Sequence, residues 1–232
     1  MDKLSLYEIL SFVVPGFVAI KVAEFFNSSV LENEKWFNYE SKFEESLVLF
    51  LLSFFVGILV HIITFRFISI KKMKWYRSLI YKTPQEISSK DRFIQKTIPF
   101  LNNDYLATKK HDEDLPMPNE AAYNLFDYAY HYLEINDKVA TAKNFQSMYY
   151  WFRNMFTICL ITFFITLIFI ILTYIYDFNS EAPKKLYWFL FIIIIFGIML
   201  IPSTQWLRKK LVEKVFWAYY VERTHKEVIK TN

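Results

Sequence analysis

The sequence predicts an all-α membrane protein with four transmembrane helices, a helical cytoplasmic insert between the second and third, and an amphipathic C-terminal helix. Apolar residues make up 54% of the chain and aromatic residues 20%, while glycine occurs only 3 times. This composition is too apolar for a soluble domain and is typical of several spanning helices. The apolar residues are also gathered into long runs, and a helix needs ~20 residues to cross a bilayer. The runs are Leu4–Phe26, Ser46–Ile70, Phe152–Tyr176 and Leu186–Ile201.

The first run, Leu4–Phe26, lacks a basic N-terminal region and a small-residue cleavage site, so we expect it to be retained rather than removed as a signal peptide. Pro15 and Gly16 lie near its middle. Two interpretations remain open: a kinked helix with polar ends, or a broken helix whose carbonyls line a cavity. Lys21 and Glu24 are three residues apart, so we predict that they pair.

The second run, Ser46–Ile70, keeps its small and polar residues on one helical face, at positions i, i+4, i+8 and i+11. We expect this face to contact protein or water, and the remaining Leu, Ile, Val and Phe residues to contact lipid. The residues of this stripe are Ser53, Gly57, His61 and Thr64.

The third run, Phe152–Tyr176, carries Thr162, Thr166 and Thr173 on one face. Either each hydroxyl bonds to the carbonyl four residues earlier and serves close helix packing, or the stripe hydrates one wall of a conduit. No proline or glycine occurs from Val139 to Tyr176. We therefore predict one continuous helix that begins in the cytoplasmic insert and crosses the membrane.

The fourth run, Leu186–Ile201, has almost no polar atoms and should face lipid on most sides. We expect Pro202 to end it. The tail that follows is predicted to be a separate amphipathic helix. Its apolar residues are Trp206, Leu207, Leu211, Val215, Phe216 and Tyr219, set against Arg208, Lys209, Lys210, Lys214, Arg223 and Lys226.

The predicted parts of the chain are a first helix pair over 1–77, a cytoplasmic insert over 78–150, a second pair over 151–202 and a C-terminal helix over 203–232. Within the insert we expect a helix start near Asp91, a short amphipathic helix disturbed by Pro99, and a surface loop over Asn102–Pro118. A further helix should run from Asn119 to about Ile135.

Charge predicts the orientation. The basic cluster Lys71, Lys72, Lys74 and Arg77 follows the second run, and Arg208–Lys210 follows the fourth. The loop over 27–45 is acidic, and the loop over 177–185 is balanced. The positive-inside rule then places both termini in the cytoplasm.

His61 is the first functional candidate, because ionisable groups inside a span are costly and often mark function. It either bonds to a neighbouring helix, to Thr64 or to Glu8, or it lines a path and titrates near neutral pH. The candidate lining or gating residues are His61, Ser53, Thr64, Thr162, Thr166, Thr173, Glu8, Lys21 and Glu24.

No catalytic motif is present in the sequence. The single cysteine, Cys159, excludes an intrachain disulfide framework, and three glycines leave little chance of a phosphate-cradling loop. His111–Asp114 is most simply a solvated charged segment. We therefore expect no cofactor, no metal and no direct contact with nucleic acid.

The layout resembles the small four-span membrane components of bacterial anti-phage defence systems, the Kiwa membrane subunit among them. The features shared are four spans, an early Pro-Gly helix (Val14-Pro15-Gly16-Phe17) and a helical insert after the second span. The resemblance implies an oligomeric sensor or effector in the bacterial cytoplasmic membrane that works with a cytoplasmic partner.

We therefore expect a non-enzymatic membrane sensor or effector that forms a homo-oligomer, docks a cytoplasmic protein and perturbs or gates the bilayer. One alternative is a membrane anchor or scaffold without a pore. The other is an intramembrane enzyme that uses His61 with Glu8 or Glu24, although the sequence supplies no activated nucleophile.

Overall fold

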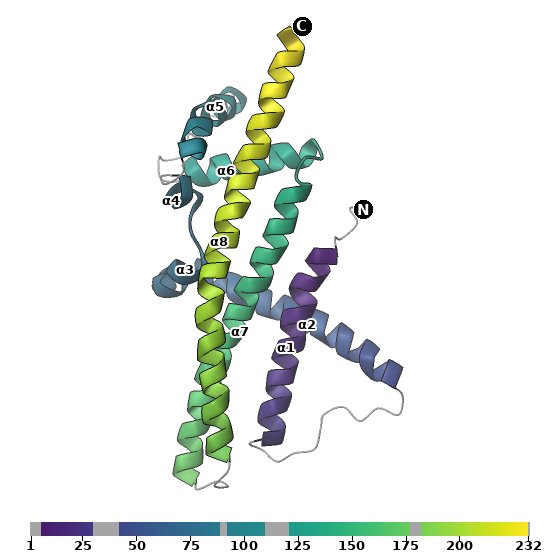
Figure 1. Cartoon of the computed structure of the whole chain (residues 1–232), viewed down its shortest axis with the longest axis vertical. Coiled ribbons are helices and arrows are strands. Elements are labelled where there is room, and N and C mark those ends of the chain that lie inside the picture. The colour runs from purple at the N-terminus through teal and green to yellow at the C-terminus, as the bar shows by residue number, and fades with distance from the viewer. Residues whose placement is uncertain (1–5, 30–41, 89–91, 110–120, 177–181, 232) are drawn as a thin grey trace. The chain divides into compact units, whose positions relative to one another are not determined.

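The computed structural model describes residues 6–29, 42–88, 92–109, 121–176 and 182–231, and within these ranges the chain is helical with short turns and no strand (Figure 1). It divides into two compact units. The first contains Met1–Ile80 and Ser147–Thr204, and the second contains Tyr81–Gln146 and Gln205–Asn232.

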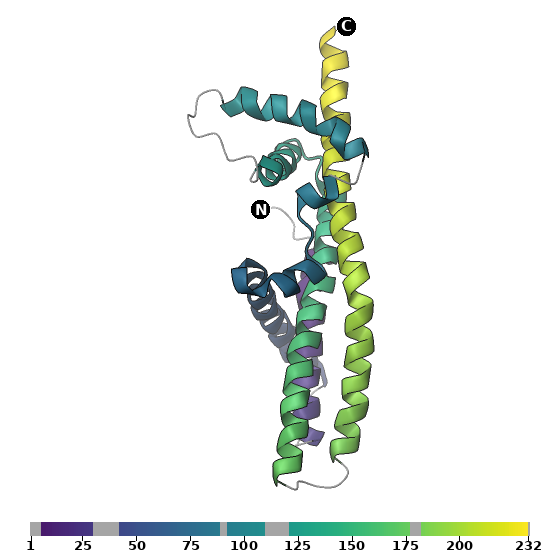
Figure 2. The same cartoon turned by 90° about the vertical axis from the view of Figure 1, so that its left-hand side faces the viewer.

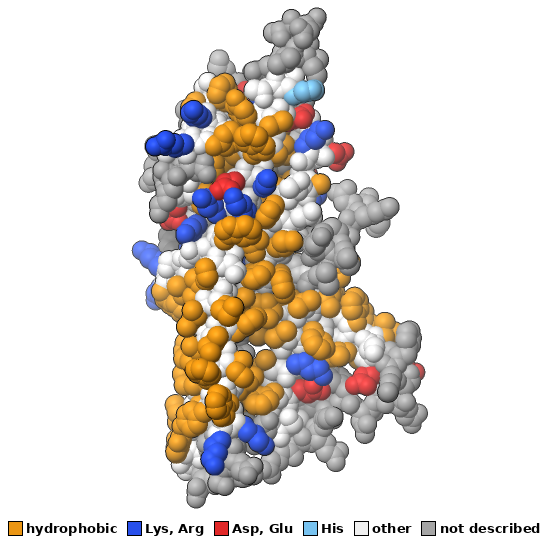
Figure 3. Space-filling model, in the orientation of Figure 1, with side chains coloured by type: hydrophobic (Ala, Val, Ile, Leu, Met, Phe, Trp, Pro, Cys, Tyr) orange, Lys and Arg blue, Asp and Glu red, His pale blue; other side chains and the backbone are white. Residues whose placement is uncertain are grey.

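Among the described residues, four helices are long and apolar enough to cross a membrane, in agreement with the predicted number of spans. They are α1 (Leu6–Ser29), α2 (Lys42–Ser69), α7 (Ala140–Tyr176) and α8 (Ala182–Thr231). α7 is unbroken over its whole length, as the absence of proline and glycine predicts. Figure 3 shows apolar side chains spread over the visible face of the spanning part of α8.

In the first unit, α1 and α2 touch through two glycines. A Cβ atom added to Gly16 would lie 1.7 Å from the carbonyl oxygen of Ser53, and one added to Gly57 would lie 1.9 Å from that of Phe12. Only hydrogen at these positions lets the two backbones approach so closely. Pro15 lies inside a continuous α1, so the helix is not broken there.

The C-terminal end of α1 is held by aromatic packing. Phe26 of α1, Ile170 of α7 and Leu186 of α8 form a buried cluster. The rings of Phe26 and Phe169 stack with their centroids 5.1 Å apart. Figures 1 and 2 show α7 and α8 side by side along this part of the first unit. After α2, a 3-10 turn (Lys71–Met73) leads into the short helix α3 (Lys74–Ile80).

The second unit has its own hydrophobic core. It is built from α4 (Pro84–Ser88), α5 (Arg92–Lys109), α6 (Ala121–Ile135), the start of α7 and the last part of α8. The core residues are Ile87, Ile94, Leu101, Leu125, Phe126, Ala129, Leu133, Val139, Ala142, Leu211, Val212, Val215, Phe216 and Tyr219. Asp104 of α5 accepts two hydrogen bonds from Arg223 of α8, each 2.8 Å long, and one from the hydroxyl of Tyr219.

Three sequence expectations were wrong. Pro202 does not end the fourth helix, because α8 continues to Thr231. Next to the proline, the hydroxyls of Ser203 and Thr204 donate to the carbonyls of Met199 and Leu200, four residues earlier in the same helix. α5 likewise runs through Pro99 and on to Lys109, so residues 102–109 are helix rather than loop.

The physical reason for the α5 result is tertiary burial. Ile94 and Leu101 are fully buried two helical turns apart, whereas Pro99 between them is exposed. The buried face therefore sustains the helix at the cost of one backbone hydrogen bond. The third wrong expectation concerns Arg208, which we had placed on a charged face. It is only 7% exposed, and its guanidinium packs on the rings of Tyr81 and Phe126.

Candidate functional site

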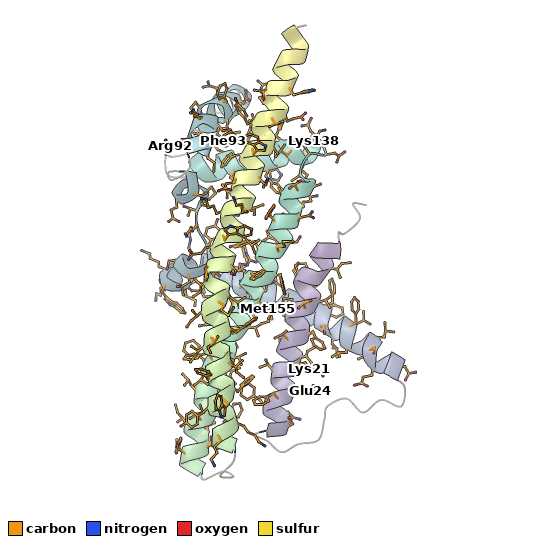
Figure 4. The ribbon with its side chains drawn as sticks, in the orientation of Figure 1. Lys21, Glu24, Arg92, Phe93, Lys138 and Met155 are labelled. Atoms are coloured by element: carbon orange, nitrogen blue, oxygen red, sulfur yellow. The ribbon has the colours of Figure 1, made fainter. Side chains whose placement is uncertain are left out.

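A buried polar cluster lies where α1, α2, α3 and α7 meet in the first unit. Met155, labelled in Figure 4, marks its level on α7. Most of the side chains around it are apolar, so these polar groups must satisfy one another. We call it the Arg153 cluster, and it consists of His61 and Thr64 from α2, Tyr76 from α3, and Arg153, Asn154 and Thr157 from α7.

Arg153 is the charged member of the cluster and is only 4% exposed. One terminal guanidinium nitrogen lies 3.1 Å from Nδ1 of His61. The guanidinium carbon lies 4.7 Å from the ring centre of Tyr150 and 5.5 Å from that of Tyr149. Aromatic faces attract a cation in this way, so the two tyrosines help to hold it in place. The Nε atom of Arg153 is buried and has no hydrogen-bond partner.

Asn154 is fully buried and joins three helices. Its Nδ2 atom lies 3.4 Å from the carbonyl oxygen of Ser11 on α1 and 3.4 Å from Nδ1 of His61 on α2. Its Oδ1 atom has no partner. The cluster therefore contains one buried donor and one buried acceptor, on neighbouring residues, that remain unsatisfied.

A chain of hydroxyl groups continues from Arg153 toward α3. Thr157 lies 2.6 Å from the hydroxyl of Thr64 and 2.7 Å from that of Tyr76. Tyr76 has no exposed surface, and burial raises the pKa of its phenol to about 12, an effect that the hydrogen bond between Tyr76 and Thr157 opposes. The Tyr76 hydroxyl is therefore neutral at physiological pH and is able to donate to Thr157.

The structure brings together only part of the predicted set. His61 and Thr64 belong to the cluster, but His61 bonds to α7 and not to Thr64, whose hydroxyl donates to the carbonyl of Val60 instead. Ser53 is 1% exposed beside the α1–α2 contact, and its hydroxyl has no partner. The side chain of Glu8 lies outside the described residues.

The other predicted residues lie away from the cluster. Thr162, Thr166 and Thr173 are buried along α7, and Thr166 and Thr173 donate to the carbonyls of Thr162 and Phe169. That pattern favours the packing interpretation over a hydrated wall. Lys21 and Glu24 form the predicted ion pair, with Nζ and Oε2 2.7 Å apart on α1 (Figure 4).

Sequence reasoning did not select Arg153, Asn154 and Thr157 as candidate functional residues. The available signal was their spacing, because residues i, i+1 and i+4 at the start of an apolar run place three polar side chains on nearly the same side of a spanning helix.

The chemistry of the cluster is that of binding and positioning. Its members supply a cation, an imidazole, an amide and hydroxyls, and no carboxylate forms an ion pair with Arg153 among the described residues. In the same part of the chain, no group of three His, Cys, Asp or Glu residues is placed to hold a metal ion. His111–Asp114 lies outside that part.

No protein-family model, curated protein or solved structure matches this chain. The class rests on the fold itself, which is that of an all-helical, multi-pass membrane protein. The resemblance to membrane components of anti-phage defence systems stays an expectation.

Proposed function

We propose that this protein is a non-enzymatic membrane module of the bacterial cytoplasmic membrane, in which the second unit docks a cytoplasmic protein and passes the event into the spans. The observation that carries the proposal is that two long helices, α7 and α8, each contribute residues to both units. α7 contributes residues to the core of the second unit through Ala142 and to the Arg153 cluster through Arg153 and Asn154. α8 is likewise unbroken from Ala182 to Thr231.

A continuous helix is a stiff connection, since no residue in it offers a flexible joint. A displacement imposed on the first turns of α7 would therefore reach Arg153 and Asn154, whose contacts join α1 and α2. The positive-inside rule supports an orientation with the second unit and both termini in the cytoplasm, because Lys72, Lys74 and Arg77 follow α2.

Two glycines inserted between Gln146 and Ser147 test the coupling, because the two units divide at that point. An antibody fragment against α5 and α6 serves as the docked partner, and hydrogen exchange over 147–157 is the readout. We expect the fragment to change exchange there in the parent protein but not in the insertion variant. The same insertion between Asn136 and Asp137, in the turn before α7, is the matched control and should preserve the response. An equal response in all three proteins would refute coupling through α7.

We further propose that several copies assemble. The described face of the fourth span exposes large apolar side chains, including Phe191, Ile192 and Ile198, and Lys21 of the α1 ion pair is half exposed. A second copy is one way to cover these groups. Native mass spectrometry in mild detergent should show an oligomer, and a monomer at every concentration would contradict this part of the proposal.

The second candidate function is an anchor or scaffold without a pore. It is favoured by the threonine hydroxyls of α7, which bond to their own helix rather than facing a water-filled path. Conductance of the purified protein in planar bilayers separates the two functions. A module that gates or perturbs the bilayer should conduct, whereas a scaffold leaves the bilayer sealed. The expected role in anti-phage defence is tested by comparing phage plating on cells with and without the gene.

A further inference from the structure

A surface cavity lies between α5 and α8 in the second unit, and we call it the α5–α8 pocket. Its volume is about 290 Å³, and its described lining consists of Phe93 of α5 with Lys210, Glu213, Lys214 and Trp217 of α8. Phe93, labelled in Figure 4, packs against Trp217 with the ring centres 4.5 Å apart. The other lining side chains are charged. The pocket therefore offers an aromatic surface and charged groups side by side.

The aromatic surface of the pocket is exposed and continues along the two helices. Trp217 is 50% exposed. Farther along, the rings of Phe93 and Phe100 both contact that of Tyr220, and Phe100 is 52% exposed. Aromatic side chains are enriched at protein–protein interfaces, where a few of them carry most of the binding energy. This side of α5 and α8 therefore has the composition of a docking surface.

The charges around the pocket favour an acidic partner. Glu213 is the carboxylate of the described lining, and it is paired with Lys210, whose Nζ lies 2.6 Å from it. Lys214 gives the lining a net positive charge. On α5, Arg92 and Lys96 are also exposed, and both lie within one turn of the lining residue of that helix. Complementary charge attracts an acidic segment and disfavours a basic one.

The size of the pocket indicates the kind of contact that it makes. Small-molecule sites usually have volumes of ~300–1,000 Å³ and enclose most of their ligand. The α5–α8 pocket is at the lower end of this range and is open to solvent. A recess of this kind suits one large side chain of a partner protein, which is the usual anchor of an interface. The exposed aromatic residues beyond it provide further surface for the same partner.

We propose that the α5–α8 pocket is where the second unit docks its cytoplasmic partner, and that the partner presents an acidic segment with one aromatic side chain. The aromatic side chain packs against Phe93 and Trp217, and the carboxylates next to it lie near Lys214. This inference rests on the proposed docking function and adds the chemistry of the partner. It does not require that the event travels along α7.

The probe is a capped five-residue peptide in which the photoreactive aromatic residue p-benzoylphenylalanine stands between two pairs of glutamates. It is cross-linked to the full-length protein in a non-ionic detergent, and the attachment sites are mapped by mass spectrometry. We expect cross-links within residues 92–100 and 210–221. The same peptide with lysines in place of the glutamates should cross-link about fivefold less, because its charges are repelled by the pocket.

Lys214→Glu should lower cross-linking of the glutamate peptide about fivefold, since an attraction is replaced by a repulsion. The lysine peptide should gain cross-linking to this variant, which shows that the variant keeps its fold. Lys138→Glu is the matched control, because it makes the same charge change at an exposed lysine that Figure 4 shows apart from Phe93. It should behave as the parent. Equal cross-linking of the glutamate peptide to the parent and Lys214→Glu would overturn the proposal.

Trp217→Leu tests the aromatic contact and should also lower cross-linking about fivefold. Trp206→Leu is its control, because Trp206 is a similarly exposed tryptophan of α8 outside the described lining of the pocket. Equal losses in the two variants would contradict the assignment of the pocket.

The remaining occupants are separated by competition. Displacement of the peptide by adenosine monophosphate would identify a small aromatic anion, and displacement by phosphatidylglycerol vesicles would identify a membrane surface. Either result would overturn a protein partner. The proposed coupling has a different readout, because it is measured by exchange over 147–157. Cross-linking in the pocket without that exchange response would support this inference and contradict the coupling, whereas the reverse result would contradict this inference alone.

Discussion

One terminal nitrogen of Arg153 on α7 lies 3.1 Å from Nδ1 of His61 on α2. A guanidinium has donors only, so Nδ1 of His61 must be the acceptor, and the imidazole proton must be on Nε2. The histidine that the sequence marks as a functional candidate is thus a neutral acceptor for a buried cation. Its role in this structure is to hold Arg153 in position.

Replacing His61 by leucine should destabilise the protein, because a buried guanidinium would lose its hydrogen-bond acceptor. The expected cost is ~1–3 kcal/mol, measured as a lower midpoint of thermal unfolding in detergent. His61→Asn retains an acceptor oxygen and should lose less. Ile62→Leu, at an exposed neighbouring position, is the control. If His61→Leu left the unfolding midpoint unchanged, the contact with Arg153 would not contribute to stability.

Gly57→Ala should disrupt the contact between α1 and α2. The new methyl group would lie 1.9 Å from the carbonyl oxygen of Phe12, which is backbone and must move. We expect destabilisation of at least ~1–3 kcal/mol, the usual cost of overpacking. Gly197→Ala is a matched control on α8, because its nearest atom is 3.9 Å away. Thermal unfolding of both variants in detergent checks the prediction, and equal midpoints would argue against a close α1–α2 contact.

Asp104→Ala should loosen α5 from α8 in the second unit. The carboxylate accepts two hydrogen bonds from Arg223 and one from Tyr219, and the alanine variant removes the acceptor of all three. We expect a loss of ~2 kcal/mol, seen as faster hydrogen exchange over 92–105. Lys96→Ala removes an exposed side chain from the same helix and should leave exchange unchanged. Unaltered exchange in Asp104→Ala would contradict the role of this network.

Tyr76 should make the protein sensitive to alkali. Its pKa is about 12 in the folded protein against an ordinary value of 10.0, so the folded state holds the phenolic proton more tightly than the unfolded state. This stabilisation is fully present below about pH 10 and is lost as pH rises toward about 12. Thermal midpoints should therefore fall over that range, and Tyr76→Phe should reduce the fall. The same slope in both proteins would show that Tyr76 does not titrate in this way.

The apolar residues of the fourth span differ in their exposure. The sequence leads us to expect that this span faces lipid on most sides, yet Ile193 is one of the buried residues of α8, so a substitution there is not a neutral control. Ile194 and Ile195 are exposed and are better suited as controls for substitutions at His61 or Thr166. Hydropathy identifies a span, but a uniformly apolar helix does not reveal which side meets its neighbours.

The sequence by itself determined the class of this protein and its number of spans. The length and apolarity of each run are local properties, and the cost of placing backbone polar groups in lipid leaves a helix as the available structure for each of them. The ion pair of Lys21 and Glu24 and the unbroken helix over 140–176 were predictable for the same reason, since spacing and the absence of proline act within one helix.

Only the tertiary structure decided which polar residues meet. Arg153 and His61 are far apart in the chain, and their contact depends on how α7 lies against α2. Helical continuity through Pro99 and Pro202 was also decided by packing, because burial on either side outweighs one lost backbone hydrogen bond. Periodicity indicates the face of a helix, whereas the partner of that face is set by contacts between distant segments.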